Sequence, residues 1–241
     1  ILKHVLPLGI SSFLTQVSIV VIMAVMNNVL VIYGAGSKYG ADIPMTVVGI
    51  VMKVFQIVIS VVVGIAAGAQ PIVGYNYGAG LWRRVKLIFR TMMAAEFSVG
   101  LVSLICFEVF PVQIISVFGS EDGLYNEFAV LAFRVFLGGI VLCCIQKSCS
   151  IFLQSMGKPA LSMLLSLLRD FVLSVPLTLV LPRFFGVTGA LYSGPAADVI
   201  SFGAAVLCMA AVFRKLNRLE DGEVALSGAS QGGLAVERKI C

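Results

Sequence analysis

The chain has 241 residues, of which 59% are hydrophobic and only 12% are charged, with a formal net charge of +5 and a mean hydropathy of +1.04. This composition excludes a water-soluble globular domain and a disordered chain, because neither class carries so much apolar sequence. The excess of basic residues is explained by membrane topology and attraction to anionic lipid, so we expect no nucleic-acid partner.

Six apolar stretches occupy almost all of the chain, and each is long enough to cross a bilayer. A hydrocarbon core requires about 20 apolar residues per helix, whereas barrel strands have about 10 residues and alternate strictly. The sequence therefore predicts an all-α integral membrane protein, with a six-transmembrane-helix bundle over residues 1–216. The expected spans are residues 5–33, 44–75, 87–110, 125–153, 160–181 and 188–213.

The first span begins almost at Ile1, with no initiator Met and no leading loop. It is too long for a signal peptide, and no small-residue cleavage site follows it. We therefore expect a membrane helix and a chain that is a fragment of a longer protein. Gln16 and Asn27 in this span can join helices through hydrogen bonds or line a cavity.

The second span ends in an unusual sequence that runs from Gly64 to Gly80. Gly64/Gly68 and Gly74/Gly78 have the GxxxG spacing that lets another helix approach closely, and Pro71 should bend or break the helix. Tight packing explains the glycines but explains the neighbouring polar residues less well, which favours a gating or cavity-lining element. The motif and gating candidates are Gly68, Gln70, Pro71, Gly74, Tyr75, Asn76 and Gly78.

Residues that commonly support catalysis or bind metals are absent or scattered. Five of the six cysteines lie inside spans without a CxxC motif, and the single histidine, His4, cannot build a metal site alone. No motif of soluble catalysis occurs. We expect no enzyme activity, no catalytic residue, no metal and no cofactor. Glu96 and Glu108 are expected close to helix ends, where neither needs a function.

Charged residues inside the spans are the main functional candidates, because each costs about 2.5 to 3.5 kcal/mol on insertion scales. Their distances from the span ends place several near the bilayer middle. We expect Asp170 and Asp198 to neutralise Lys53, Arg134 and Arg169 in part, with Arg169 and Asp198 as neighbours. A structural or coupling network is favoured over direct substrate contact. Gln56 and Gln146 are the first candidates for cavity lining. The full candidate set is Gln16, Asn27, Lys53, Gln56, Arg134, Gln146, Lys147, Arg169, Asp170 and Asp198.

Basic residues beside the spans are distributed asymmetrically. One side has only Lys38 and Arg183, which by the positive-inside rule places both chain ends in the cytoplasm. After the sixth span, residues 217–241 are rich in Gly, Ser and charge, so we expect a disordered cytoplasmic tail. The basic residues of the other side are Lys3, Arg83, Arg84, Lys86, Arg90, Lys158, Arg214, Lys215 and Arg218.

Several of these motifs resemble the multidrug and toxic compound extrusion (MATE) family. The sequence from Gly68 to Gly78 is similar to the signature that ends the eighth helix of that family. Further similarities follow in the family's order at Asn27-Asn28, residues 152–158, residues 164–169 and residues 195–198. Family members carry twelve helices in two lobes, so the resemblance implies the C-terminal six-helix lobe of a bacterial multidrug exporter.

The resemblance also implies an antiporter that expels bulky, often cationic amphiphiles by rocking two lobes around a cavity, driven by Na⁺ or H⁺. Its setting would be the bacterial inner membrane, and its partners would be small amphiphilic substrates, membrane lipid and the missing N-terminal lobe. Some members carry cation-binding carboxylates in the seventh and tenth helices, but the corresponding spans here contain only Glu127. The coupling acid is therefore expected in the missing lobe, or at Asp170 and Asp198.

Two other functions stay open. One is a lipid-linked saccharide or polysaccharide flippase of the same superfamily, which the basic residues inside the spans favour. The other is a non-transporting membrane scaffold, for which the charges inside the spans would be replaceable without loss of function.

Overall fold

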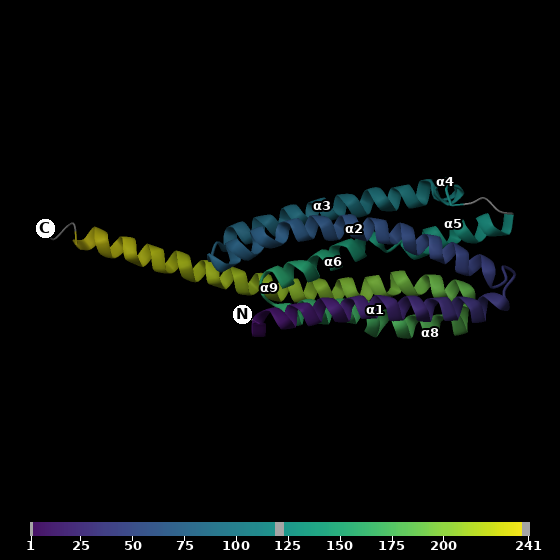
Figure 1. Cartoon of the computed structure of the whole chain (residues 1–241). Helices are drawn as coiled ribbons and strands as arrows, with labels where there is room; N and C mark the ends of the chain where they lie inside the picture. The colour runs from purple at the N-terminus through teal and green to yellow at the C-terminus, as the bar shows by residue number, and fades with distance from the viewer. Residues whose placement is uncertain (1, 119–122, 238–241) are drawn as a thin grey trace.

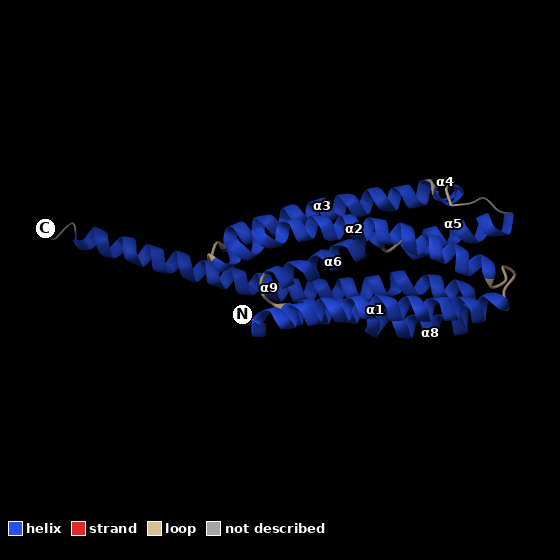
Figure 2. Ribbon diagram, in the orientation of Figure 1, coloured by secondary structure: helices blue, strands red, loops and turns tan. Residues whose placement is uncertain are grey.

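The computed structural model describes the backbone of residues 2–118 and 123–237, and the side chains of residues 13, 14, 16–118 and 123–222. Within these residues every regular element is helical (Figure 2). The helices form a bundle with six spans that are long and apolar enough to cross a membrane, and two of these spans consist of more than one helical segment (Figure 1). This confirms the predicted all-α bundle of six spans. The spans are α1 (Leu2–Ala35), α2 (Asp42–Gly78), α3 (Trp82–Val109), α5 with α6 (Gly123–Leu137 and Ile140–Ser155), α7 with η1 and α8 (Pro159–Leu167, Leu168–Leu173 and Ser174–Phe185), and α9 (Val187–Glu237); α4 (Pro111–Ser116) is a short helix after α3.

The connections between spans alternate between the two ends of the bundle (Figure 1). Four of them are tight turns that contain a glycine with positive φ, a backbone conformation that other residues rarely adopt. Glycine is thus the residue that permits the short connections and the antiparallel packing of consecutive helices. These residues are Gly40 (φ 69°), Gly80 (φ 74°), Gly157 (φ 70°) and Gly186 (φ 61°).

Two of the six spans are interrupted near the middle of the bundle. The fourth span breaks at Gly138 and Gly139, between α5 and α6. A Cβ atom on Gly139 would lie 2.7 Å from Oδ2 of Asp198, so glycine here lets that carboxylate approach the backbone. The fifth span contains η1, a π-helical turn between α7 and α8. Single π-turns inside helices occur frequently at functional sites.

The apolar core consists of two clusters with a polar layer between them. The first cluster includes Leu30, Val51 and Phe133, and the second includes Phe152 and Leu216. On α6 the first cluster ends at Cys144 and the second begins at Cys149, so Lys147 lies between them. On α9 the first cluster ends at Leu191 and the second begins at Ala205, so Asp198 lies between them. The charged residues therefore occupy the middle level of the bundle.

Helix α9 continues through Glu237 and extends beyond the bundle (Figure 1), which differs from the disordered tail expected from residue 217. The first turns of this segment are bound to α3, because Lys86 pairs with Glu220 and donates a hydrogen bond to Oδ1 of Asn217 at 2.9 Å. Leu216 is buried at the same level. A domain boundary at residue 216 therefore falls within a helix. Residues 238–241 of the expected tail lie outside the described residues.

The close contact of α8 and α9 gives a stability prediction. A Cβ atom on Gly189 would meet the carbonyl oxygen of Leu181 and approach Cα of Pro182 to 2.8 Å, both of them backbone atoms. We expect Gly189→Ala to destabilise the protein by about 1–3 kcal/mol through overpacking. Thermal unfolding of the purified protein in detergent measures the loss. Gly203→Ala on the same helix is the control, because its Cβ would meet no atom within 4 Å. Equal melting temperatures of the two variants would contradict the prediction.

Candidate functional site

Four charged side chains form a continuous network in the polar layer. Arg169 donates from Nε to Oδ1 of Asp198 at 2.9 Å and from Nη1 to Oδ1 of Asp170 at 2.7 Å, and Lys147 donates to Oδ2 of Asp170 at 3.2 Å. Both carboxylates are 3% exposed. We call these four residues the charge quartet. The predicted adjacency of Arg169 and Asp198 is confirmed.

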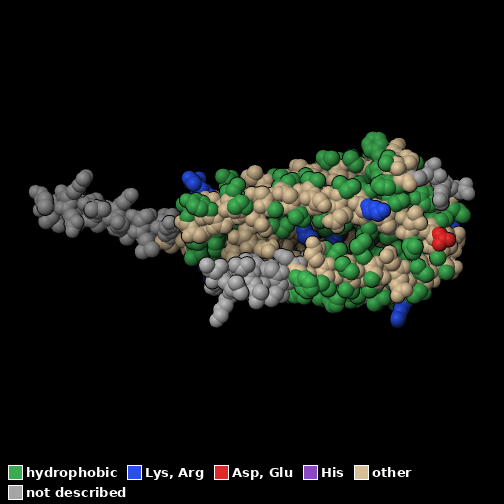
Figure 3. Space-filling model, viewed as in Figure 1, with side chains coloured by type: hydrophobic (Ala, Val, Ile, Leu, Met, Phe, Trp, Pro, Cys, Tyr) green, Lys and Arg blue, Asp and Glu red, His purple; other side chains and the backbone are tan. Residues whose placement is uncertain are grey.

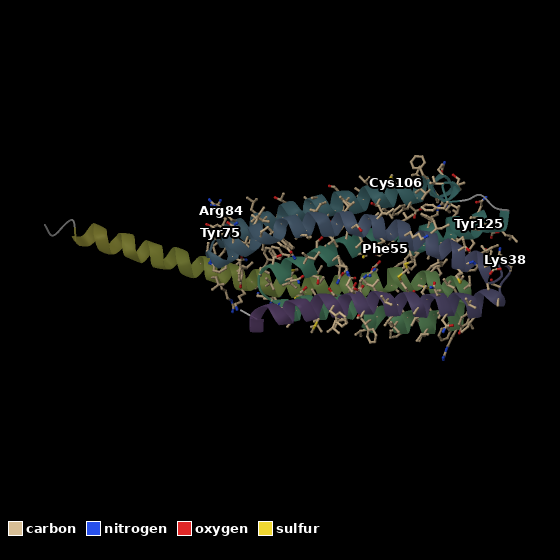
Figure 4. All side chains as sticks on the ribbon, viewed as in Figure 1. Lys38, Phe55, Tyr75, Arg84, Cys106 and Tyr125 are labelled. Atoms are coloured by element: carbon tan, nitrogen blue, oxygen red, sulfur yellow. The ribbon has the colours of Figure 1, made fainter. Side chains whose placement is uncertain are left out.

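The π-turn supplies two consecutive members of the quartet. In a regular α-helix, adjacent side chains such as Arg169 and Asp170 point in directions about 100° apart. The wider turn η1 contains both residues, and the hydroxyl of Ser174 donates to the carbonyl oxygen of Arg169, five residues earlier, at 2.7 Å. The guanidinium of Arg169 also lies 5.7 Å from the ring centroid of Phe55, labelled in Figure 4. These contacts fix the position of Arg169 at the junction of η1, α2 and α9.

A cavity of about 740 Å³ lies beside the quartet, within the range of small-molecule pockets. Figure 3 shows basic side chains in a hollow between α1 and α2. The lining combines polar and charged side chains with apolar ones, including methionines from α1 and α2. The site can therefore hold a molecule with one polar and one apolar part. Its main polar lining residues are Gln16, Lys53, Gln56, Lys147, Arg169 and Asp170, and its main apolar ones are Ile19, Met23, Met26, Met52, Phe55 and Ile59.

Six of the ten candidate residues line this cavity, and four do not. Asp198 lies behind Arg169, and Asn27 is exposed on α1 outside the lining. Gln146, a first candidate for cavity lining, is fully buried and donates to the carbonyl oxygen of Leu165 at 3.0 Å. It therefore joins α6 to α7, which is the hydrogen-bonding role of polar residues between membrane helices.

Arg134 was expected beside Asp170 and Asp198 in the central charge cluster, and this was wrong. Its side chain is 54% exposed and its Nε lies 3.4 Å from Oε2 of Glu108, away from the quartet. The buried residues of α5 include Ala132 and Phe133, so Arg134 is on the other face of the helix. Lys147 takes the expected place of Arg134 in the cluster. Lys53 lines the cavity but forms no ion pair within the described residues.

Glu96 was expected near a helix end, and this was wrong. The residue lies at the centre of α3 and is fully buried, and its carboxyl oxygens accept no hydrogen bond from the described residues. The helix begins at Trp82, five residues before the predicted span, and Glu96 is near the middle of both the helix and that span. Glu127, by contrast, is held at the bundle end by Lys38 and Tyr39, at 2.8 and 3.1 Å.

The glycine motif of α2 is placed in a continuous helix. Pro71 lies inside α2, which runs unbroken to Gly78, so the helix is not broken there. A Cβ atom on Gly68 would meet no atom within 4 Å, whereas one on Gly74 would lie 3.4 Å from the carbonyl oxygen of Ser155. Gly68 therefore contacts no other helix closely in the described part of the chain. Of the other candidates, Gln70 is half-buried, Tyr75 is 73% exposed and Gly78 is exposed. Asn76 is buried, and its side chain donates to the carbonyl oxygen of Ile72 at 2.7 Å.

Comparison with known proteins relates this architecture to one family. The model of the MatE family matches residues 8–180. The multidrug export protein MepA of Staphylococcus aureus is 22% identical over 209 residues, which are 86% of this chain and 44% of the relative.

Solved structures of similar fold match a comparable share of their own chains. An outward-facing multidrug resistance MATE family transporter of the MOP superfamily has a TM-score of 0.81 and 19% identity, covering 90% of this chain and 48% of that chain. An inward-facing one has a TM-score of 0.76 and 18% identity, covering 87% and 47%. The chain thus spans about half the length of the relatives it matches.

The quartet predicts a specific pattern of mutational effects. Arg169→Gln leaves two carboxylates with Lys147 alone, and Asp198→Asn leaves two cations with Asp170 alone, whereas the double variant is again neutral. We expect each single variant to lose about 3–5 kcal/mol of stability, because it leaves a buried charge without a partner. The double variant should lose less than either single variant. Thermal unfolding in detergent measures all three. A double variant whose loss equals the sum of the single losses would show that the charges do not compensate one another.

Proposed function

The chain belongs to the MatE family, and on that premise we propose that it forms the C-terminal six-helix lobe of a bacterial multidrug exporter. The observation that carries the proposal is the cavity at the middle level of the bundle, where transporters built from structural repeats bind their substrates. Its lining has the mixed polar and apolar character that an amphiphilic compound requires.

The proposed mechanism is alternating access between two lobes. The missing N-terminal six-helix lobe supplies the second wall of the cavity, and rocking of the lobes exposes the substrate first to one side of the membrane and then to the other. A Na⁺ or H⁺ gradient drives the cycle as antiport. The coupling carboxylate is in the N-terminal lobe, or it is Asp170 or Asp198. The quartet holds α6, η1 and α9 in register.

The proposed setting is the bacterial inner membrane, with membrane lipid around the lobe and both chain ends in the cytoplasm. The basic residues support this orientation: Arg83, Arg84 and Lys158 lie at or beside the α2–α3 and α6–α7 turns, on the side of the chain ends. A flippase for lipid-linked saccharides is the second candidate function, and the three cations Lys53, Lys147 and Arg169 in the cavity lining favour it. No observation favours a scaffold without transport activity.

Co-expression tests the exporter proposal. A cavity between two lobes needs both walls, so this chain alone should give no dye efflux from energised vesicles. The chain together with a matching N-terminal lobe should give efflux that stops when the Na⁺ or H⁺ gradient is dissipated. Vesicles with the N-terminal lobe alone are the control. Gradient-driven efflux by the 241-residue chain without any partner would contradict the half-transporter proposal.

Gly68 tests whether α2 contacts the other lobe. Because its Cβ would meet no atom of the described chain, Gly68→Leu should leave membrane insertion and the melting temperature of this lobe unchanged. We expect the Leu variant to lose most of the efflux of the co-expressed lobes, since a large side chain prevents the close approach of a second surface. Gly68→Ala is the matched control and should retain efflux. Full efflux by the Leu variant would remove Gly68 from the proposed contact.

A further inference from the structure

We propose that the cavity binds amphiphiles that carry an anionic group, a carboxylate or a phosphate, through the ammonium group of Lys53. The inference rests on the proposed function and narrows its substrate class. It follows from the charges around the cavity: among the described residues of the lining, Lys53 is a cation without a charged partner, and the one carboxylate already holds two cations.

The carboxylates of the polar layer are already occupied. Asp170 accepts from Arg169 at Oδ1 and from Lys147 at Oδ2, so both of its oxygens hold a cation. Asp198 accepts from Arg169 and does not line the cavity. Among the described residues, Asp170 is the only acidic residue of the lining, so a cationic ligand would find no free counter-ion there.

Among the described residues that line the cavity, Lys53 is the cation that no charged group neutralises. The quartet is balanced, with two cations and two carboxylates, and Lys53 forms no ion pair or hydrogen bond with any described residue. Its side chain is exposed within the lining of the cavity. Gln56, three residues further along α2, and Gln16 on α1 add uncharged hydrogen-bonding groups. An ammonium group without a counter-ion attracts an anionic group, and the attraction grows as the bound ligand displaces water from the cavity.

The remaining lining suits the body of an amphiphile. Met23, Met26 and Met52 lie in the wall together with Ile19 and Phe55. Methionine side chains are flexible and polarizable, so they adapt to apolar groups of different shapes. The geometry therefore combines one anion-binding group with an adaptable apolar wall. A bulky cation in the same place would instead meet the positive charges of Lys53, Lys147 and Arg169, which line the cavity with Asp170.

Fluorescent ligands with and without a charge test the inference. The full chain is purified into nanodiscs of phosphatidylcholine and titrated with dansylaminoundecanoic acid and with its methyl ester, and dansyl fluorescence reports binding. The acid should bind at least about tenfold more tightly than the ester, the gain of a charge-assisted hydrogen bond. Lys53→Gln should abolish this preference and leave the affinity for the ester unchanged. Lys53→Arg should keep it, and so should Arg214→Gln, the control for an exposed basic residue outside the cavity.

The contrary results are equally specific. Equal affinities for acid and ester, or a preference that survives Lys53→Gln in a variant with unchanged melting temperature, would overturn the inference. Tighter binding of dansylundecylamine than of the acid would also overturn it, while the exporter proposal would stand. Acid binding without gradient-driven efflux in the co-expressed lobes would remove the exporter proposal and leave the anion site in place.

A competition arm identifies the source of the anionic group. Short-chain phosphatidic acid is titrated against the bound dansyl acid, with short-chain phosphatidylcholine as the control. Displacement by phosphatidic acid alone supports the inference with an anionic lipid as ligand. Displacement by neither lipid, with tight binding of the free acid, supports it with soluble acids as ligands. Equal displacement by both lipids would mean that the headgroup charge is not recognised and would overturn the inference.

Discussion

The balance of charge in the middle of the bundle is the constraint on which the rest of the site depends. A single ion in hydrocarbon is costly, and the quartet keeps its two cations and two carboxylates within hydrogen-bonding distance of one another. Two departures from regular helix serve this arrangement. The break at Gly139 lets Asp198 approach the backbone, and the π-turn places Arg169 and Asp170 together in the network. The irregular backbone of the fourth and fifth spans is thus coupled to the charges they carry.

The fold was predictable because it is set by length and hydropathy, whereas the site was predictable only in part. Six apolar stretches determine six spans, and equal depth correctly placed Arg169 beside Asp198. Depth does not determine which face of a helix a residue occupies. Arg134, on α5, therefore faces away from the charge quartet. Lys147, on α6 of the same span, is a member of the quartet. A search for the buried stripe of α5, through Phe128, Ala132 and Phe133, would have revealed the error.

Other features depend on contacts that the sequence does not specify locally. The π-turn of η1 follows no breaker residue, and composition alone does not reveal the contacts of Lys86 that hold the start of the expected tail. The burial of Glu96 was missed although the predicted third span, residues 87–110, already places this residue near its middle. Gly68 and Gly74 share one motif, yet only Gly74 approaches another helix of this lobe. Spacing identifies a surface suited to close approach, but not the partner that occupies it.

The same charge balance limits how the proposed ion coupling could use the carboxylates of this chain. Each oxygen of Asp170 accepts a hydrogen bond from a cation, so a Na⁺ ion or a proton that binds there competes with Lys147 and Arg169 for the carboxylate. Lys147 is on α6 and Asp170 is on η1, so withdrawal of Lys147 requires either its side chain or one of these helices to move. An ion that binds only after such a movement favours the conformation in which the network is open. Coupling at this site would therefore work through competition with a basic side chain, whereas Lys53, the proposed ligand contact, forms no ion pair with the network.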